Sequence, residues 1–252
     1  MPSRPAARPA ARRKPARNAY HHGDLRQSML TAALQLLAEQ GLEHFTLREC
    51  ARRAGVSHGA PAHHFGDVRG LLSALAAGGF DALVHNMRAH EAAAPADAYS
   101  QLVANGQAYV DFALRHRAWF QLMFRSDRLD ASHEPLMAAG HAAFAALQAH
   151  IAAVSPRASP AVQSQRTALA WAMVHGAATL MIENSEFGAF APGDTPAASA
   201  KLVAEMLQLA RPAFDDAAAT APAAPSSRRG HPFPAGARIT RRQRQTRGGP
   251  TR

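Results

Sequence analysis

Apolar side chains recur at three- and four-residue intervals along most of the chain, which is the period of an amphipathic helix. The clearest case is the stretch from 46 to 65, which reads TLRECARRAGVSHGAPAHHF. Its first half carries an apolar stripe that comprises Leu47, Cys50, Ala51 and Ala54. No alternation of apolar and polar residues persists anywhere in the chain, so the pattern predicts an all-α protein.

Capping residues mark the ends of two short helices within 46–65. Thr46 followed by Glu49 fits a capping box, in which the hydroxyl accepts from the third amide and the acid reaches back. Gly55 stands where a helix end favours a left-handed residue, and Ser57 is placed to cap a second helix over 58–65. Two short helices around a glycine-containing turn predict a helix-turn-helix, whose second helix usually enters the major groove of DNA.

A longer helix is expected upstream of this motif and completes a three-helix unit. Asp24 is its expected N-cap, with Gln27 at the third position, and Gly41 ends it. The residues of its expected buried stripe are Leu25, Met29, Ala33, Leu36 and Leu37.

Further helices are expected over 67–90, 97–115, 117–128, 135–154, 162–184 and 196–211, separated by segments rich in proline or polar residues. Gly78 and Gly79 lie in the middle of the first of these helices and weaken it, by about 1 kcal/mol each relative to alanine. Two interpretations of this glycine pair stay open: a hinge between two domains, or close packing against another helix.

Charge is distributed unevenly along the 252 residues, whose formal net charge is +10. Residues 1–17 hold six basic residues and 226–252 hold eight, with no acidic residue in either segment. The segment between them holds all 18 acidic residues and is net negative. Because both ends are rich in proline, alanine and arginine, we expect disordered basic tails, which either contact DNA phosphates or are solubilising extensions.

Several classes of protein are disfavoured by composition. A single cysteine excludes an intrachain disulfide framework and fits the reducing cytoplasm, where a DNA-binding protein would associate with the nucleoid. No apolar run is long enough to suggest a membrane span, and no membrane partner is expected. The chain lacks a His-Glu-x-x-His pattern, cysteine pairs and a phosphate-binding glycine loop, so we expect no catalytic residue, no metal and no cofactor.

The residues HGDLRQSMLTAALQLLAEQG, FTLRECARRAGVSHG and HHF resemble the TetR family of bacterial transcriptional regulators, and WAMVHGA at 171–177 is similar to the Trp-His-Gly signature of one effector-domain type in that family. The resemblance implies a disordered basic arm (1–19), a helix-turn-helix DNA-binding domain (20–68, motif 47–66), a helical effector-binding and dimerisation domain (69–214) and a disordered Arg-rich tail (215–252). It implies a homodimeric repressor that binds a palindromic double-stranded DNA operator and responds to a small apolar or amphipathic effector.

The resemblance also assigns roles to residues. The DNA contacts it implies are Thr46, Arg48, Ser57, His58, Gly59, His63 and His64. Relatives carry a tyrosine at the position of Ala62 and a lysine at that of Val68, and Arg69 is the expected substitute for their phosphate contacts. The last two helices would form the dimer interface, with Ala172, Gly176, Ala177 and Ala178 allowing close helix approach.

Aromatic and sulfur-containing side chains of the second domain could line an apolar cavity. The candidates for effector contacts are Phe112, Trp119, Met123, Phe124, Trp171 and Met181, with His175 or His141 as an orienting polar group. Plain core packing is the alternative for each of them. For the whole chain the alternatives are a sequence-tolerant architectural DNA binder that uses its basic arms, or an all-α enzyme or metal-binding protein suggested by 14 histidines.

Overall fold

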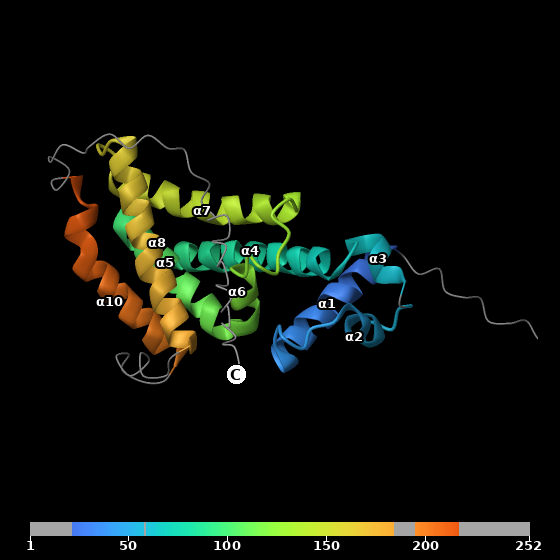
Figure 1. Cartoon of the computed structure of the whole chain (residues 1–252). Helices are drawn as coiled ribbons and strands as arrows, with labels where there is room; N and C mark the ends of the chain where they lie inside the picture. The colour runs from blue at the N-terminus through green and yellow to red at the C-terminus, as the bar shows by residue number, and fades with distance from the viewer. Residues whose placement is uncertain (1–21, 58, 184–194, 217–252) are drawn as a thin grey trace, which may run out of the picture.

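The computed structural model describes residues 22–57, 59–183 and 195–216. The predicted tail 1–19 lies outside these residues, as does the predicted tail 215–252 except for its first two residues, Asp215 and Asp216. The helices are α1 (His22–Gln40), α2 (Leu47–Arg53), α3 (Ala60–Phe65), α4 (Val68–Ala93), α5 (Ala98–Arg115), α6 (Arg117–Met123), α7 (Glu134–Val154), α8 (Pro160–Glu183) and α10 (Pro196–Phe214). Helices α1 to α3 form a small unit at one end, and α4 runs from it into a larger helical part (Figure 1). No strand occurs among the described residues, and the prediction of an all-α fold is confirmed.

Helix α1 packs its predicted stripe into the small unit. Met29, Ala33, Leu36 and Leu37 are buried, and Leu25 is half-buried against the same core. The helix begins at His22, so Asp24 lies inside the helix and the prediction that it is the N-cap is wrong. Gly41 ends the helix with a φ of 71°, as predicted.

Helix α5 lies at the centre of the larger part and contacts α4, α6, α7, α8 and α10. Its N-cap is Asp97, whose carboxylate accepts from the Ser100 amide at 3.0 Å. Gly106 faces α10 at a distance that leaves no room for a side chain, because a Cβ there would lie 2.8 Å from a Leu207 methyl group. The close contact of α5 and α10 therefore depends on this glycine.

The C-terminal end of α10 is held by a buried arginine on α8. Arg166, 5% exposed, donates to the carbonyl oxygens of Ala213 and Asp215 and lies 3.2 Å from a carboxylate oxygen of Asp216. The Ser155 hydroxyl, before α8, donates to the Phe214 carbonyl at 2.7 Å. These bonds satisfy the free carbonyls that a helix end leaves behind, and they fix α10 against α8.

Helix α7 is long and apolar enough to cross a membrane by length and composition alone, so the expectation that no apolar stretch is long enough is wrong for this helix. One such helix is weak evidence for a membrane protein. In the structure, α7 packs on α4, α5 and α8 and buries Leu136, Ala139, Gly140, Ala143 and Ile151. Its position is that of a helix in the bundle.

The glycine pair of α4 lies where α6 crosses it. A Cβ at Gly79 would lie 2.7 Å from Met123 Sδ and 2.9 Å from Trp119 Nε1, whereas a Cβ at Gly78 would lie 3.5 Å from a carbon of the Trp119 ring. The Trp119 indole donates to the Leu75 carbonyl at 2.7 Å and fixes α6 on α4. Of the two interpretations of this pair, close packing is the one that the structure supports.

The different surroundings of the two glycines give a prediction. Gly79→Ala should lower the free energy of unfolding by about 1–2 kcal/mol, because the clash with the buried Met123 and with Trp119 outweighs the helix propensity of alanine. Gly78→Ala meets only ordinary contacts and should stabilise the protein by up to about 1 kcal/mol. Urea denaturation of both variants measures the difference. Equal effects of the two substitutions would contradict the packing account.

Candidate functional site

The turn between α2 and α3 has the hydrogen bonds of a complete helix C-cap. Gly55, at a φ of 67°, donates its amide to the Arg52 carbonyl at 3.2 Å, and the Val56 amide donates to the Ala51 carbonyl at 3.0 Å. This pair of bonds is the Schellman motif, which redirects the chain sharply after a helix. Val56 is half-buried against the core beneath the turn, so the angle between α2 and α3 is fixed by backbone geometry and packing together.

The start of α2 confirms one half of the predicted capping box. The Thr46 hydroxyl accepts from the Glu49 amide at 3.3 Å. The Glu49 carboxylate does not reach back, because it accepts from the Arg52 guanidinium at 2.7 and 2.8 Å and from Arg53 at 3.1 Å. Hydrogen bonds from Arg52 and then Arg53 lower the pKa of Glu49 to about 2. Both arginines are thus engaged within the unit, and Arg53 also pairs with Glu39 of α1 at 2.7 Å.

Helix α3 is shorter than predicted. It begins at Ala60 with Gly59 as its cap residue, and the prediction that Ser57 is the N-cap is wrong. The Ser57 carbonyl accepts from the Ala60 amide at 3.1 Å, so 57–60 form a turn before the helix. Pro61 lies in the first helical turn, where its missing N–H is tolerated. Arg26 of α1 covers the Phe65 ring at 5.7 Å from the ring centre and holds the end of α3.

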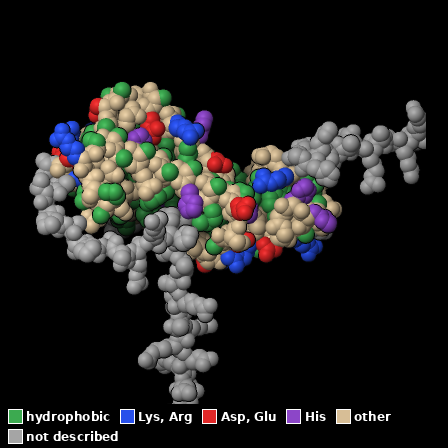
Figure 2. Space-filling view, turned by 90° about the horizontal axis from the view of Figure 1, so that it is seen from above, with side chains coloured by type: hydrophobic (Ala, Val, Ile, Leu, Met, Phe, Trp, Pro, Cys, Tyr) green, Lys and Arg blue, Asp and Glu red, His purple; other side chains and the backbone are tan. Residues whose placement is uncertain are grey.

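The residues predicted to contact DNA lie at the start of α2, in the turn and on α3. Thr46, Arg48, Ser57, Gly59 and His63 are exposed, and His64 is half-buried beside Phe65, with 6.4 Å between ring centres. His58 lies outside the described residues. Arginine and histidine side chains are visible on this end of the molecule in Figure 2. The polar side chains of α3 are thus two imidazoles, the exposed His63 and the half-buried His64.

The expectation for Arg69 is not supported by its contact. Its guanidinium donates to the carbonyl oxygen of Leu129, in the loop between α6 and α7. In the same loop the Asp130 amide donates to the Ser73 hydroxyl at 2.8 Å, and Arg128 pairs with Glu43 at 3.0 Å. One nitrogen of Arg69 is therefore engaged by the loop between α6 and α7, and its role as a phosphate contact stays a prediction.

Cys50 gives a direct test of how tightly the helix-turn-helix unit is packed. It is the only cysteine of the chain and is 0% exposed, and burial raises the pKa of its thiol to about 11. At pH 8 we expect a chromogenic disulfide reagent to label native protein at least about 100-fold more slowly than urea-unfolded protein, because the thiolate is scarce and screened. Equal rates would contradict the packing of α2 on α1.

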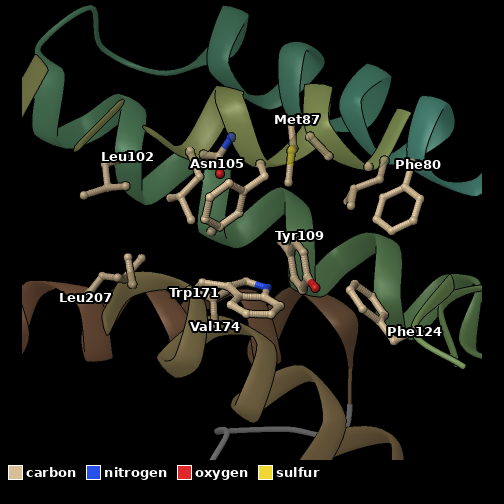
Figure 3. A pocket seen from close by; sticks show the side chains of 16 residues that line it. Phe80, Met87, Leu102, Asn105, Tyr109, Phe124, Trp171, Val174 and Leu207 are labelled. Atoms are coloured by element: carbon tan, nitrogen blue, oxygen red, sulfur yellow. The ribbon is translucent and has the colours of Figure 1, made fainter. Parts of the chain in front are cut away.

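A cavity of about 60 Å³ lies in the larger part, enclosed by α4, α5, α7, α8 and α10 (Figure 3). Its lining is largely apolar and aromatic: Phe80, Leu83, Met87, Leu102, Asn105, Gly106, Tyr109, Phe124, Gly140, Ala143, Phe144, Leu147, Ala170, Trp171, Val174 and Leu207. Asn105 and the Tyr109 hydroxyl are the polar groups among them, together with the Trp171 N–H. The cavity can accommodate an apolar group with one or two hydrogen-bonding atoms.

The Tyr109 hydroxyl of the cavity lining bonds to a residue outside the lining. The Tyr109 hydroxyl lies 2.8 Å from Nδ1 of His175. Burial raises the pKa of Tyr109 far above its ordinary range, with a hydrogen bond from Trp171 acting in the opposite direction, and burial lowers the pKa of His175. Both groups are therefore neutral near pH 7. Figure 3 shows the Tyr109 hydroxyl between Trp171 and Phe124.

At Asn105 the cavity reaches a charged cluster. The Asn105 amide donates to the Glu91 carboxylate at 2.8 Å, and Nε2 of His150 lies 2.9 Å from the same oxygen. Glu91 is thus shared by α5 and α7 at the end of α4. Its carboxylate fixes the orientation of Asn105, and this leaves the Asn105 carbonyl oxygen as an acceptor for a bound molecule.

Some of the residues predicted to contact the effector line the cavity, others do not, and Asn105 lines it without having been predicted. Phe124 and Trp171 line the cavity, and His175 supports it through Tyr109. Phe112, Trp119 and Met123 lie outside the lining and pack within the core, where Phe112 and Met123 are each 2% exposed. Met181 is buried outside the lining, and His141 is exposed on α7. Asn105 was missed although it lies three residues after Leu102 and four before Tyr109, and a polar residue on an inward stripe is a detectable signal.

Two family models match the two parts of the chain. Residues 29–75 match the model described as bacterial regulatory proteins of the tetR family, and residues 102–207 match the model described as the tetracyclin repressor-like C-terminal domain. The chain belongs to the TetR family. The similarity predicted from 46–65 and its flanking residues is therefore confirmed at the level of the family.

Individual proteins and solved structures are similar to this chain. The HTH-type transcriptional regulator BetI of Serratia proteamaculans is 45% identical over 49 residues, which are 19% of this chain and only 25% of BetI. A solved protein of unknown function from Rhodococcus sp. RHA1 is 32% identical, with a TM-score of 0.61 over 75% of this chain and 96% of that one. The TetR family regulator PfmR of Thermus thermophilus shares the fold, with a TM-score of 0.53 at 18% identity over 73% of this chain and 94% of PfmR.

Among the described residues, no group of three or more His, Cys, Asp and Glu side chains is arranged to hold a metal ion. Four of the described histidines belong to the two features described above: His63 and His64 lie on α3, and His150 and His175 support polar residues of the cavity. The described histidines therefore give no support to a metal-binding site.

Proposed function

We propose that this protein is a cytoplasmic, nucleoid-associated transcriptional repressor that binds a palindromic operator as a homodimer and is released by a small effector. The observation that carries the proposal is the helix-turn-helix of α2 and α3, with its exposed polar residues on one continuous stretch of chain. Residues 20–68 would bind DNA and 69–214 would bind the effector and the second protomer, while 1–19 and 215–252 would be basic tails.

The proposed DNA contacts follow from the exposed groups of the unit. Thr46 and Arg48 lie at the start of α2, where free amides and the helix dipole favour a phosphate. Ser57, His58, Gly59, His63 and His64 would approach the major groove. Direct readout usually uses Arg, Lys, Asn or Gln side chains, whereas the polar side chains of α3 are imidazoles. These would donate to the oxygen or nitrogen acceptors of guanine or to phosphate oxygens. Sequence preference would therefore depend partly on DNA shape.

A selection experiment tests this function. Full-length protein is incubated with a random-sequence pool of duplex DNA at physiological salt, and bound molecules are sequenced after several rounds. We expect an inverted repeat whose half-sites are centred about 10 base pairs apart or a multiple of this. A pool that stays without a consensus would contradict the proposal and favour the sequence-tolerant architectural binder, for which the basic tails would supply the affinity.

The homodimer is proposed from apolar side chains that α8 and α10 leave exposed. Leu169 and Leu180 are 40% and 44% exposed on α8, and Leu209 is 84% exposed on α10. Gly176 has no atom within 4 Å of its expected Cβ position, and Ala172 is exposed on the same helix, whereas Ala177 and Ala178 are buried. A partner helix could approach closely at Gly176. Ala177 and Ala178, which were also expected there, pack inside the protomer.

Leu180→Arg tests the dimer. It would place two cations at the proposed interface, one from each protomer, and we expect the dissociation constant of the dimer to rise at least about 30-fold. Ala145→Arg, at an exposed position of α7, is the matched control and should leave self-association unchanged. Sedimentation velocity over a concentration series measures both, and an unaffected dimer in Leu180→Arg would place the interface elsewhere.

The effector domain would be of the Trp-His-Gly type. In support, Trp171 lines the cavity, His175 bonds to Tyr109, and Gly176 leaves α8 open on the other side. A small, largely apolar effector with a hydrogen-bonding group would lie among Phe124, Trp171 and Tyr109. Because the cavity is only about 60 Å³, a larger effector can bind only if the helices from α4 to α8 move away from one another. Such an effector would shift the population towards the wider conformation that it fits.

A further inference from the structure

A second and larger cavity lies at the junction of the DNA-binding unit with the rest of the chain. This junction cleft has a volume of about 360 Å³, against about 60 Å³ for the interior cavity. Sites for small molecules usually measure about 300–1,000 Å³. In this conformation, therefore, the junction cleft and not the interior cavity has room for a small molecule.

Three helices from distant parts of the sequence form the junction cleft. The lining includes Leu37 and Glu43 at and just after the end of α1, Gln121 and Phe124 on and just after α6, and Thr179 and Glu183 on α8. A molecule bound here would touch the DNA-binding unit and the effector domain at once. Its affinity would therefore depend on how the two are oriented.

The chemistry of the lining selects a neutral amphipathic molecule. Phe120, Phe124 and Ile182 provide an apolar surface, and Gln121 and Thr179 provide hydrogen-bonding groups. Two charged residues of the lining lie in ion pairs: Arg125 bonds to Asp127 at 2.9 Å and lies 3.8 Å from Glu43, which Arg128 approaches to 3.0 Å. Glu183 adds a further carboxylate to the lining on α8. An anionic ligand would be repelled by Glu43 and Glu183 and would have to compete for Arg125, whereas a neutral aromatic body with one polar end would not.

The junction cleft and the interior cavity share a wall. Phe124 lines both, and its ring centre is 4.5 Å from that of His175, which lines the cleft and bonds to Tyr109 of the cavity. Burial lowers the pKa of His175, so this wall is neutral near pH 7. A molecule in the cleft and an effector in the cavity would therefore both displace the same two side chains, Phe124 and His175.

We propose that the junction cleft, bounded by α1, α6 and α8, is a binding site for a neutral, amphipathic aromatic molecule, separate from the effector cavity. Such a molecule acts as a wedge between the DNA-binding unit and the effector domain, because its contacts are divided between α1 on one side and α6 and α8 on the other. The site does not depend on the identity of the effector or of the operator.

The test uses the full chain and Nile red, a neutral amphipathic dye whose fluorescence rises in apolar surroundings. Gln121→Trp and Thr179→Phe fill the cleft from α6 and from α8, and Ala143→Leu fills the interior cavity. Gln148→Trp, at an exposed position of α7, controls for an added surface tryptophan. Circular dichroism melting curves check that each variant is folded.

We expect saturable, one-site binding of Nile red to the wild type. Gln121→Trp and Thr179→Phe should each weaken it at least about tenfold, whereas Gln148→Trp and Ala143→Leu should change it less than about twofold. Absence of saturable binding by the folded wild type would overturn the proposal. So would loss of binding in Ala143→Leu with binding retained in both cleft variants, since the dye would then occupy the interior cavity.

Discussion

His63→Glu should lower the affinity for the operator at least about 100-fold. His63 is exposed on α3, and the described exposed polar groups of this helix are imidazoles, which donate to phosphate or to guanine acceptors. Glutamate removes the donor and places an anion against the DNA. A lost DNA contact costs about 1–3 kcal/mol, and a dimer loses it twice. Fluorescence anisotropy with the selected operator measures the effect.

The matched control is His141→Glu, the same substitution at an exposed histidine of α7. It changes the net charge equally but lies far from the helix-turn-helix along the chain, so we expect less than a threefold change in affinity. The milder variants Ser57→Ala and His63→Ala should weaken binding and leave the dimer intact. Wild-type affinity of His63→Glu would show that α3 does not enter the groove as proposed.

Arg166→Ala should lower the free energy of unfolding by about 3 kcal/mol, which for a chain of this size is a fall in Tm of roughly 6–12 °C. The Arg166 side chain is 5% exposed and binds the carbonyls of Ala213 and Asp215 as well as Asp216. Its removal leaves these partly buried acceptors without their donor. Because α10 contributes to the proposed dimer interface, self-association should weaken as well.

Arg157→Ala is the control for this prediction. Arg157 is exposed, and only its main-chain amide, which alanine retains, bonds to Asp216, at 2.9 Å. The two variants therefore remove the same charge near the same helix end, yet Arg157→Ala should change the Tm by less than about 2 °C. Scanning calorimetry compares them, and equal shifts would mean that Arg166 acts only as a surface charge.

The sequence predicted the helices well because their signals are local. The apolar stripe of α1, the cap at Thr46 and the left-handed Gly55 each depend on a few adjacent residues, and the structure confirms all three. The cap at Ser57 failed because Gly59 takes the position before Ala60. The predicted bond from the Glu49 carboxylate back to the start of α2 is not formed, because two arginines on the same helix bind this carboxylate.

The cavity was harder to predict, because a buried side chain on one helix does not reveal which other helices face it. Trp119 and Met123 lie on the same apolar helix as Phe120, but they fill the space left by Gly79 of α4. Tyr109 was correctly placed on the inward side of α5, and its bond to His175, 66 residues away, could not be predicted from spacing. The junction cleft likewise depends on the approach of α1 to α6 and α8.

The most direct test of the central claim is an anisotropy titration of DNA from upstream of the protein's own gene. It is done at physiological salt with excess nonspecific competitor, and it compares the full chain with a chain trimmed to residues 18–215. The account predicts saturable binding by both chains that resists the competitor, because α2 and α3 read the sequence and the tails only add affinity. Binding by the full chain alone, lost to the competitor, would contradict it, since the basic tails would then carry the interaction.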